Sequence, residues 1–224
     1  MGKKYLPSLW LTLLAAGICA AAAAYGGRAW AAASVLLALL ACLPFFLRCE
    51  RSRPSPETVT LIAVMTAVSV MGRVIFAPVP GFKPVSAVAA ICGMYFGPSA
   101  GFMCGALSAA ASNMFFGQGP WTPFQMLAWG VCGLLAGLLS APLRRSRVLL
   151  CVYGVLSGVL FSFIMDIWTA LSLDGYLTLR RWLALTVAAL PFTAMYAVGN
   201  VVFLLLLARP LGRKLARIKQ KYGL

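Results

Sequence analysis

Long apolar runs, separated by short stretches rich in charge, proline or glycine, follow one another along almost the whole chain. A helix that crosses a membrane needs about 20 mainly apolar residues. On this basis the pattern predicts eight spans: 8–25, 29–47, 57–76, 85–97, 99–114, 123–141, 148–170 and 182–208. We therefore expect an all-α polytopic membrane protein.

Two polar segments interrupt this apolar pattern, APVPGFKP at 77–84 and FFGQGPWT at 115–122. Their prolines prevent regular helix. The predicted span 85–97 between them is also short, since 13 residues cover only about 20 Å against about 30 Å of hydrocarbon. Non-helical backbone at membrane depth needs protein or a water-filled cavity to satisfy its polar groups. Both segments are expected to line one cavity that opens to the outside.

The distribution of charge supports this topology. Of 224 residues, 62% are hydrophobic and 10% are charged, whereas a soluble globular protein has about 25% charged residues. With both termini in the cytoplasm, fourteen of the nineteen Lys and Arg residues fall on the cytoplasmic side, as expected of membrane proteins. The net charge of +15 is thus interpreted as topology, with membrane lipid and not nucleic acid as the surroundings.

Three regions are predicted along the chain. Residues 1–56 form an extension of two transmembrane helices that ends in the basic linker RCERSRPSP, residues 57–208 form a six-helix core, and residues 209–224 form a basic cytoplasmic tail. The first apolar run follows MGKK, so it is either a cleaved signal peptide or a retained helix. We favour the retained helix.

Two charges fall inside predicted spans, Arg73 near the outer end of 57–76 and Asp166 within 148–170. Charges inside a membrane usually face an interior cavity and find a partner. One interpretation is that they contact a substrate. The alternatives are an ion pair between Arg73 and Asp166, or an Arg73 side chain that reaches to the interface.

The other candidate binding residues carry amide, aromatic or basic side chains. Amides suit a neutral polar ligand, and aromatic rings provide flat apolar walls, although Trp and Tyr also gather at membrane interfaces generally. Lys83 in the first polar segment is expected to reach either a ligand's negative group or a lipid phosphate. The substrate-binding candidates are Arg73, Lys83, Asn113, Gln118, Trp121, Gln125, Trp129, Asp166 and Asn200, with Phe124, Trp168 and Tyr196 as further candidate walls.

Catalytic and metal chemistry are poorly supported. The chain has four acids and no histidine, and its seven cysteines form no CxxC pair, so we predict no catalytic residue, metal site or cofactor. A GxxxxGK[ST] phosphate loop is also missing, so active transport would need a separate ATP-hydrolysing motor.

The stretch AVMTA places Ala63 and Ala67 four residues apart on one helix face. Small residues at this spacing allow another helix to approach closely. They indicate either a contact within the chain or a docking surface for a partner protein.

These features resemble the S components, the substrate-binding membrane subunits, of energy-coupling factor (ECF) vitamin transporters. The resemblance covers about residues 57–208. It rests on the six-span core, the AVMTA stretch, the basic cytoplasmic ends and the block FKPVSAVAAICGMYFGPSAGFMCGALSAAASNMFFGQGPWTPFQMLAWG. It implies a subunit of the bacterial cell membrane that is not an enzyme. Such a subunit captures a vitamin outside the cell, and its Ala63 and Ala67 face a T component coupled to two ATPases.

Within this resemblance, the block is most similar to S components for cobalamin or related corrinoids, with riboflavin, a queuosine precursor or another flat heterocycle as alternatives. A rival of another class is a membrane enzyme acting on lipid headgroups. A secondary transporter working alone is expected to show an internal repeat, and neither polar segment has a second copy.

Overall fold

The computed structural model describes residues 27–51, 54–175 and 177–223, and all regular secondary structure in these ranges is helical. The helices are α2 (Gly27–Arg51), α3 (Pro56–Ile75), α4 (Val85–Phe96), α5 (Pro98–Phe116), α6 (Thr122–Leu138), α7 (Ser140–Arg145), α8 (Arg147–Asp174), α9 (Leu179–Ala188) and α10 (Leu190–Tyr222). The expected all-α fold is confirmed. The first predicted span, 8–25, lies outside the described residues.

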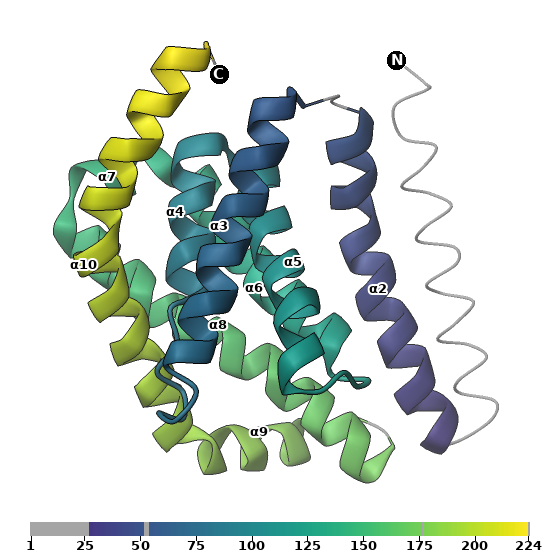
Figure 1. The fold of residues 1–224 in the computed structure, drawn as a ribbon. Helices are drawn as coiled ribbons and strands as arrows, with labels where there is room; N and C mark the ends of the chain where they lie inside the picture. The colour runs from purple at the N-terminus through teal and green to yellow at the C-terminus, as the bar shows by residue number, and fades with distance from the viewer. Residues whose placement is uncertain (1–26, 52–53, 176, 224) are drawn as a thin grey trace, which may run out of the picture.

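The helices α3, α4, α5, α6, α8 and α10 run alternately down and up, with α2 beside them (Figure 1). We call the end that carries the α2–α3 connection, α7 and the C-terminus the upper end. The lower end carries the loops 77–84 and 117–121, and α9 lies across it (Figure 1). Both irregular segments predicted from the sequence therefore lie at the same end of the molecule.

Three described helices are long and apolar enough to cross a membrane, namely α3, α8 and α10. Two of them, α3 and α8, begin at a serine whose side chain caps the helix. Ser55 caps α3 by accepting a hydrogen bond from the backbone N–H of Thr58 at 3.3 Å, and Ser146 caps α8 in the same way through Leu149 at 3.3 Å. These lengths support the prediction of a polytopic membrane protein.

Helix α4 is the centre of the bundle. It has 12 residues, about 18 Å of helix, and ten of them are buried. Glycines let its neighbours approach at backbone distance: a Cβ atom added at Gly133 of α6 would overlap the carbonyl of Gly101 in α5, and one added at Gly93 of α4 would overlap the carbonyl of Gly133. Such contacts hold helices together where lipid removes the hydrophobic driving force.

The last predicted span, 182–208, is wrong as a single helix. The structure divides it at Ala189 into α9 and α10, with Pro191 in the first turn of α10, where its missing N–H costs nothing. None of the α9 residues is buried. Helix α10 then continues through the basic stretch 209–224 as far as Tyr222, with Pro210 inside it.

Helix α2 packs directly on the core, against α5, α6 and α8. Cys42 of α2 clusters with Phe102 and Ala106 of α5, and Ala38 clusters with Phe124 of α6. The described part of the N-terminal extension is therefore in contact with the core helices.

We predict that Gly133→Ala lowers the free energy of unfolding by about 3 kcal/mol, because the added methyl group meets the rigid backbone of α5. The measurement is the thermal unfolding midpoint of the purified protein in detergent. Gly199→Ala is the matched control, since its Cβ would lie 3.1 Å from the Phe82 ring, a side chain that can shift. Equal midpoints for the two variants would contradict the close contact.

Candidate functional site

A buried arginine organises the lower end. Arg73, in the last turn of α3, donates through Nη1 to the hydroxyl of Ser112 and to Oδ1 of Asn113 at 2.8 Å. Its side chain is buried, and its partners on α5 carry no charge. Hydrogen bonds to a charged donor are stronger than those between neutral groups, which offsets part of the cost of burying the guanidinium.

Asn113 is the hub of a network that crosses from α5 to α6. While Oδ1 accepts from Arg73, Nδ2 donates to Thr122 Oγ1 and to Gln125 Oε1, both at 2.8 Å. The hydroxyl of Thr122 donates in turn to Oε1 of Gln118 at 2.9 Å. One amide thus fixes the relative position of α3, α5 and α6 at the lower end.

Aromatic rings continue the site from Arg73 towards α10. The guanidinium lies 4.7 Å from the centroid of the Phe116 ring and 4.9 Å from that of Trp129. Trp129 stacks on Phe161 of α8 at 5.0 Å, and Phe161 contacts Tyr196 of α10 at 4.7 Å. Desolvated cation–π contacts of this kind help to stabilise a buried arginine.

A cavity of about 250 Å³ opens beside this aromatic layer, between α6, α8 and the start of α10. Gln125, Ser162 and Asp166 supply its polar groups, and the rings of Phe161, Phe192 and Tyr196 are among its walls. Gln125 belongs to both the cavity and the hydrogen-bond network, so the two form one site. A few polar groups among apolar walls are typical of a small-molecule site.

Asp166 and Arg73 do not form an ion pair, so that alternative is wrong. Arg73 is held by Ser112 and Asn113, whereas Asp166 lines the cavity with its Oδ2 buried and without a hydrogen-bond partner. The hydroxyl of Thr186 in α9 lies beside this carboxylate, which is the charged group among the residues that line the cavity.

Three other candidate residues lie apart from the cavity. Lys83, half-buried in the 77–84 loop, places its ammonium group 5.8 Å from the Phe116 ring centroid. Burial lowers the pKa of Lys83, and the positive charge of Arg73 lowers it further.

Trp121 is partly exposed and folds over Gly119. Asn200 is fully buried and donates to Ser157 Oγ at 3.0 Å, with its own Oδ1 unpaired.

Several residues of the site were not singled out from the sequence. Ser112 and Thr122 complete the network, while Phe161 and Ser162 line the cavity. Ser162 could have been found from the sequence, because it precedes Asp166 by one helical turn and so lies on the same face of the helix.

The alanine pair lies on the opposite side of α3 from the core. Ala63 and Ala67 are both exposed. Ala67 lines an apolar groove of about 650 Å³ between α3, α4 and α10, together with side chains such as Met71 and Leu206. The helix face with small residues is thus accessible to lipid or to another helix.

One comparison with known proteins finds a relationship. The sequence model of the family described as ECF-type riboflavin transporter, S component, matches residues 53–217. No curated protein and no solved structure matches the chain.

We predict that Asn113→Ala lowers the free energy of unfolding by about 2–3 kcal/mol, because it leaves the buried guanidinium of Arg73 without a main acceptor. Gln118→Ala, which removes an amide at the exposed edge of the same network, is expected to cost less than about 1 kcal/mol. Thermal unfolding in detergent measures both. A larger effect for Gln118→Ala would contradict the role of Asn113 as the hub.

Proposed function

Because this chain belongs to the family of S components of ECF-type riboflavin transporters, we propose that it captures a flat heterocyclic vitamin, riboflavin in the first place, in the lower-end cavity. In this function the chain binds its ligand without reacting with it, and import depends on a T component and two ATPases. Family membership makes the chain a transporter subunit, and the choice of vitamin and of residues is our proposal.

The cavity beside Gln125 carries the proposal. Its aromatic walls, Phe161, Phe192 and Tyr196, offer faces on which a flat ring system can stack. Gln125 and Asp166 line the cavity, where their polar side chains can pair with polar edges of such a ring or with hydroxyl groups of its side chain. These chemical features match riboflavin, which joins a flat tricyclic ring to a polyhydroxyl chain.

The size of the cavity helps to choose between the candidate vitamins. At about 250 Å³ it suits a small heterocycle better than a corrinoid, whose macrocycle and attached nucleotide are much larger. The family match likewise names riboflavin. A queuosine precursor is the second candidate, since it too combines a flat ring with polar substituents.

We further propose that the lower end faces the outside of a bacterial cell membrane and that the upper end faces the cytoplasm. The upper end carries Arg144, Arg145 and Arg147 around the α7–α8 turn, and the basic end of α10. Membrane proteins concentrate Lys and Arg on the cytoplasmic side. In this orientation the vitamin cavity opens towards the external medium.

The exposed face of α3 is the proposed docking surface for the T component. Ala63 and Ala67 leave the backbone of α3 accessible, and the groove beside Ala67 is almost entirely apolar. A helix from the partner can pack there through close van der Waals contact.

We predict that Gln125→Ala and Asp166→Asn each weaken riboflavin binding at least tenfold, because each removes a polar partner inside the cavity. The measurement is quenching of riboflavin fluorescence on titration with the purified protein in detergent. Asp174→Asn is the matched control: it lies on the same helix, but its carboxylate pairs with Arg181 at 2.8 Å outside the cavity.

The same titration is run with cobalamin and a queuosine precursor as competitors. Tight binding of cobalamin without riboflavin binding would overturn the choice of vitamin and retain the family. A protein that binds none of the three would contradict vitamin capture in this cavity.

For docking, we predict that Ala67→Leu reduces co-purification of the T component at least tenfold while riboflavin binding is unchanged, because the larger side chain blocks the close approach of a helix. Ala194→Leu, at an exposed position of α10, is the control for a general effect of added bulk. Equal recovery of the T component with Ala67→Leu and the parent protein would place the docking surface elsewhere.

A further inference from the structure

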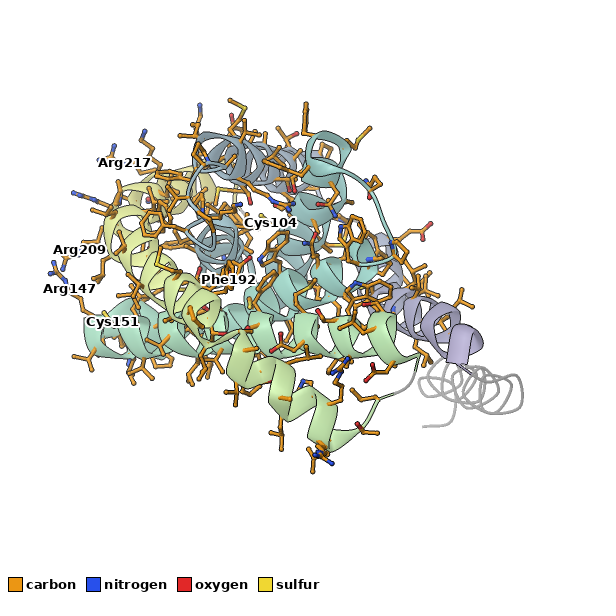
Figure 2. All side chains as sticks on the ribbon, turned by 90° about the horizontal axis from the view of Figure 1, so that it is seen from below. Cys104, Arg147, Cys151, Phe192, Arg209 and Arg217 are labelled. Carbon is orange, nitrogen blue, oxygen red and sulfur yellow. The ribbon has the colours of Figure 1, made fainter. Side chains whose placement is uncertain are left out.

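A second cavity, of about 410 Å³, lies at the upper end, at the opposite end of the bundle from the vitamin site. We call it the arginine cavity. Five arginines line it: Arg144, Arg145, Arg147, Arg209 and Arg213. They come from two separate parts of the chain, the α7–α8 turn and α10. Figure 2 shows the side chains of Arg147 and Arg209 near one another at the edge of the molecule, with Arg217 further along α10.

Tyr95, at the end of α4, holds the two basic segments together. The guanidinium of Arg144 lies 4.7 Å from its ring centroid. Its hydroxyl packs against Gly212 of α10 so closely that a Cβ atom there would overlap it. The backbone carbonyl of Tyr95 also accepts a hydrogen bond from Lys219 Nζ at 3.3 Å. The convergence of the arginines is thus built into the packing of α4, α7 and α10.

Within residues 27–51, 54–175 and 177–223, no salt bridge neutralises these positive charges. No acidic side chain is among the residues that line the arginine cavity. In the described part of the chain, the one salt bridge joins Asp174 to Arg181. Like charges gathered in one concavity repel each other, so a bound anion stabilises the arrangement. Guanidinium groups bind phosphate oxygens particularly well, through two parallel hydrogen bonds.

The surroundings favour a lipid as the source of the anion. Met94, Leu143 and Leu150 form an apolar part of the lining. Val148 is 73% exposed directly after Arg147, and Leu205 is exposed one turn from Arg209 towards the middle of the membrane. Arginines beside lipid-facing apolar side chains are the arrangement found where basic pockets between transmembrane helices bind anionic headgroups.

We propose that the arginine cavity binds the phosphate of an anionic phospholipid headgroup, with the acyl chains lying along α8 and α10. Membrane topology alone requires positive charge on one side. It does not require five arginines from two segments to line one cavity. Lys214 and Arg217 of α10 also place positive charge on this side of the membrane, and they do not line the cavity. This site is separate from the vitamin cavity and does not depend on it.

The test compares phosphatidylglycerol with phosphatidylcholine for binding to the full chain in detergent, by native mass spectrometry. The double variant Arg144→Gln/Arg209→Gln is expected to bind phosphatidylglycerol about 30-fold more weakly than the parent protein. The control, Lys214→Gln/Arg217→Gln, removes the same charge from α10 outside the cavity and is expected to lose less than threefold. Equal thermal unfolding midpoints show that both variants fold.

Three results would overturn the proposal. The first is equal binding of phosphatidylglycerol and phosphatidylcholine to the parent protein, and the second is an equal loss in the control variant. The third is binding of inorganic phosphate or soluble glycerol phosphate as tight as that of the lipid, which would assign the cavity to a soluble phosphate. A tenfold or larger preference for phosphatidylglycerol over glycerol phosphate, lost only in the cavity variant, supports it.

Discussion

Backbone contact between α4, α5 and α6 is the constraint on which the rest of the molecule depends. Where Gly93, Gly101 and Gly133 meet, side chains are absent from the interface, so the three helices lie closer than ordinary packing allows. At the lower end, the short connection 117–121 keeps the end of α5 beside the start of α6, where Asn113 reaches both Thr122 and Gln125. The glycine contacts hold α5 against α6 at the upper end and the polar network holds them together at the lower end, where it also supplies the acceptors of the buried Arg73.

The site combines a rigid part with an open part. Arg73 and Asn113 have their main hydrogen bonds made within the chain, which suits a structural role at the floor of the site. Asp166 and Gln125 face a cavity. Fixing the surroundings while leaving a few groups open lowers the cost of ordering the site when a ligand binds.

Much of this architecture was predictable because proline, glycine and charge mark the ends of most helices. The ends of α3 and α5 agree with the predicted spans to within two residues at each end, since Pro56, Pro98 and Gly117 punctuate them. The break before α10 was missed because hydropathy does not fall at Ala189. The partner of Arg73 was also beyond prediction: depth along a helix is readable from the sequence, but the direction a side chain faces depends on how helices rotate against each other.

Pro210 weakens the backbone hydrogen bonding of α10 at a point between the two cavities. Without a backbone N–H, Pro210 leaves the carbonyl of Leu206 without its helical donor, so α10 is weakest where its membrane-embedded part meets its basic end. Tyr196 lies below this point and Arg213 above it. Pro210 therefore makes α10 easier to bend between the lower-end cavity, which Tyr196 lines, and the arginine cavity, which Arg213 lines.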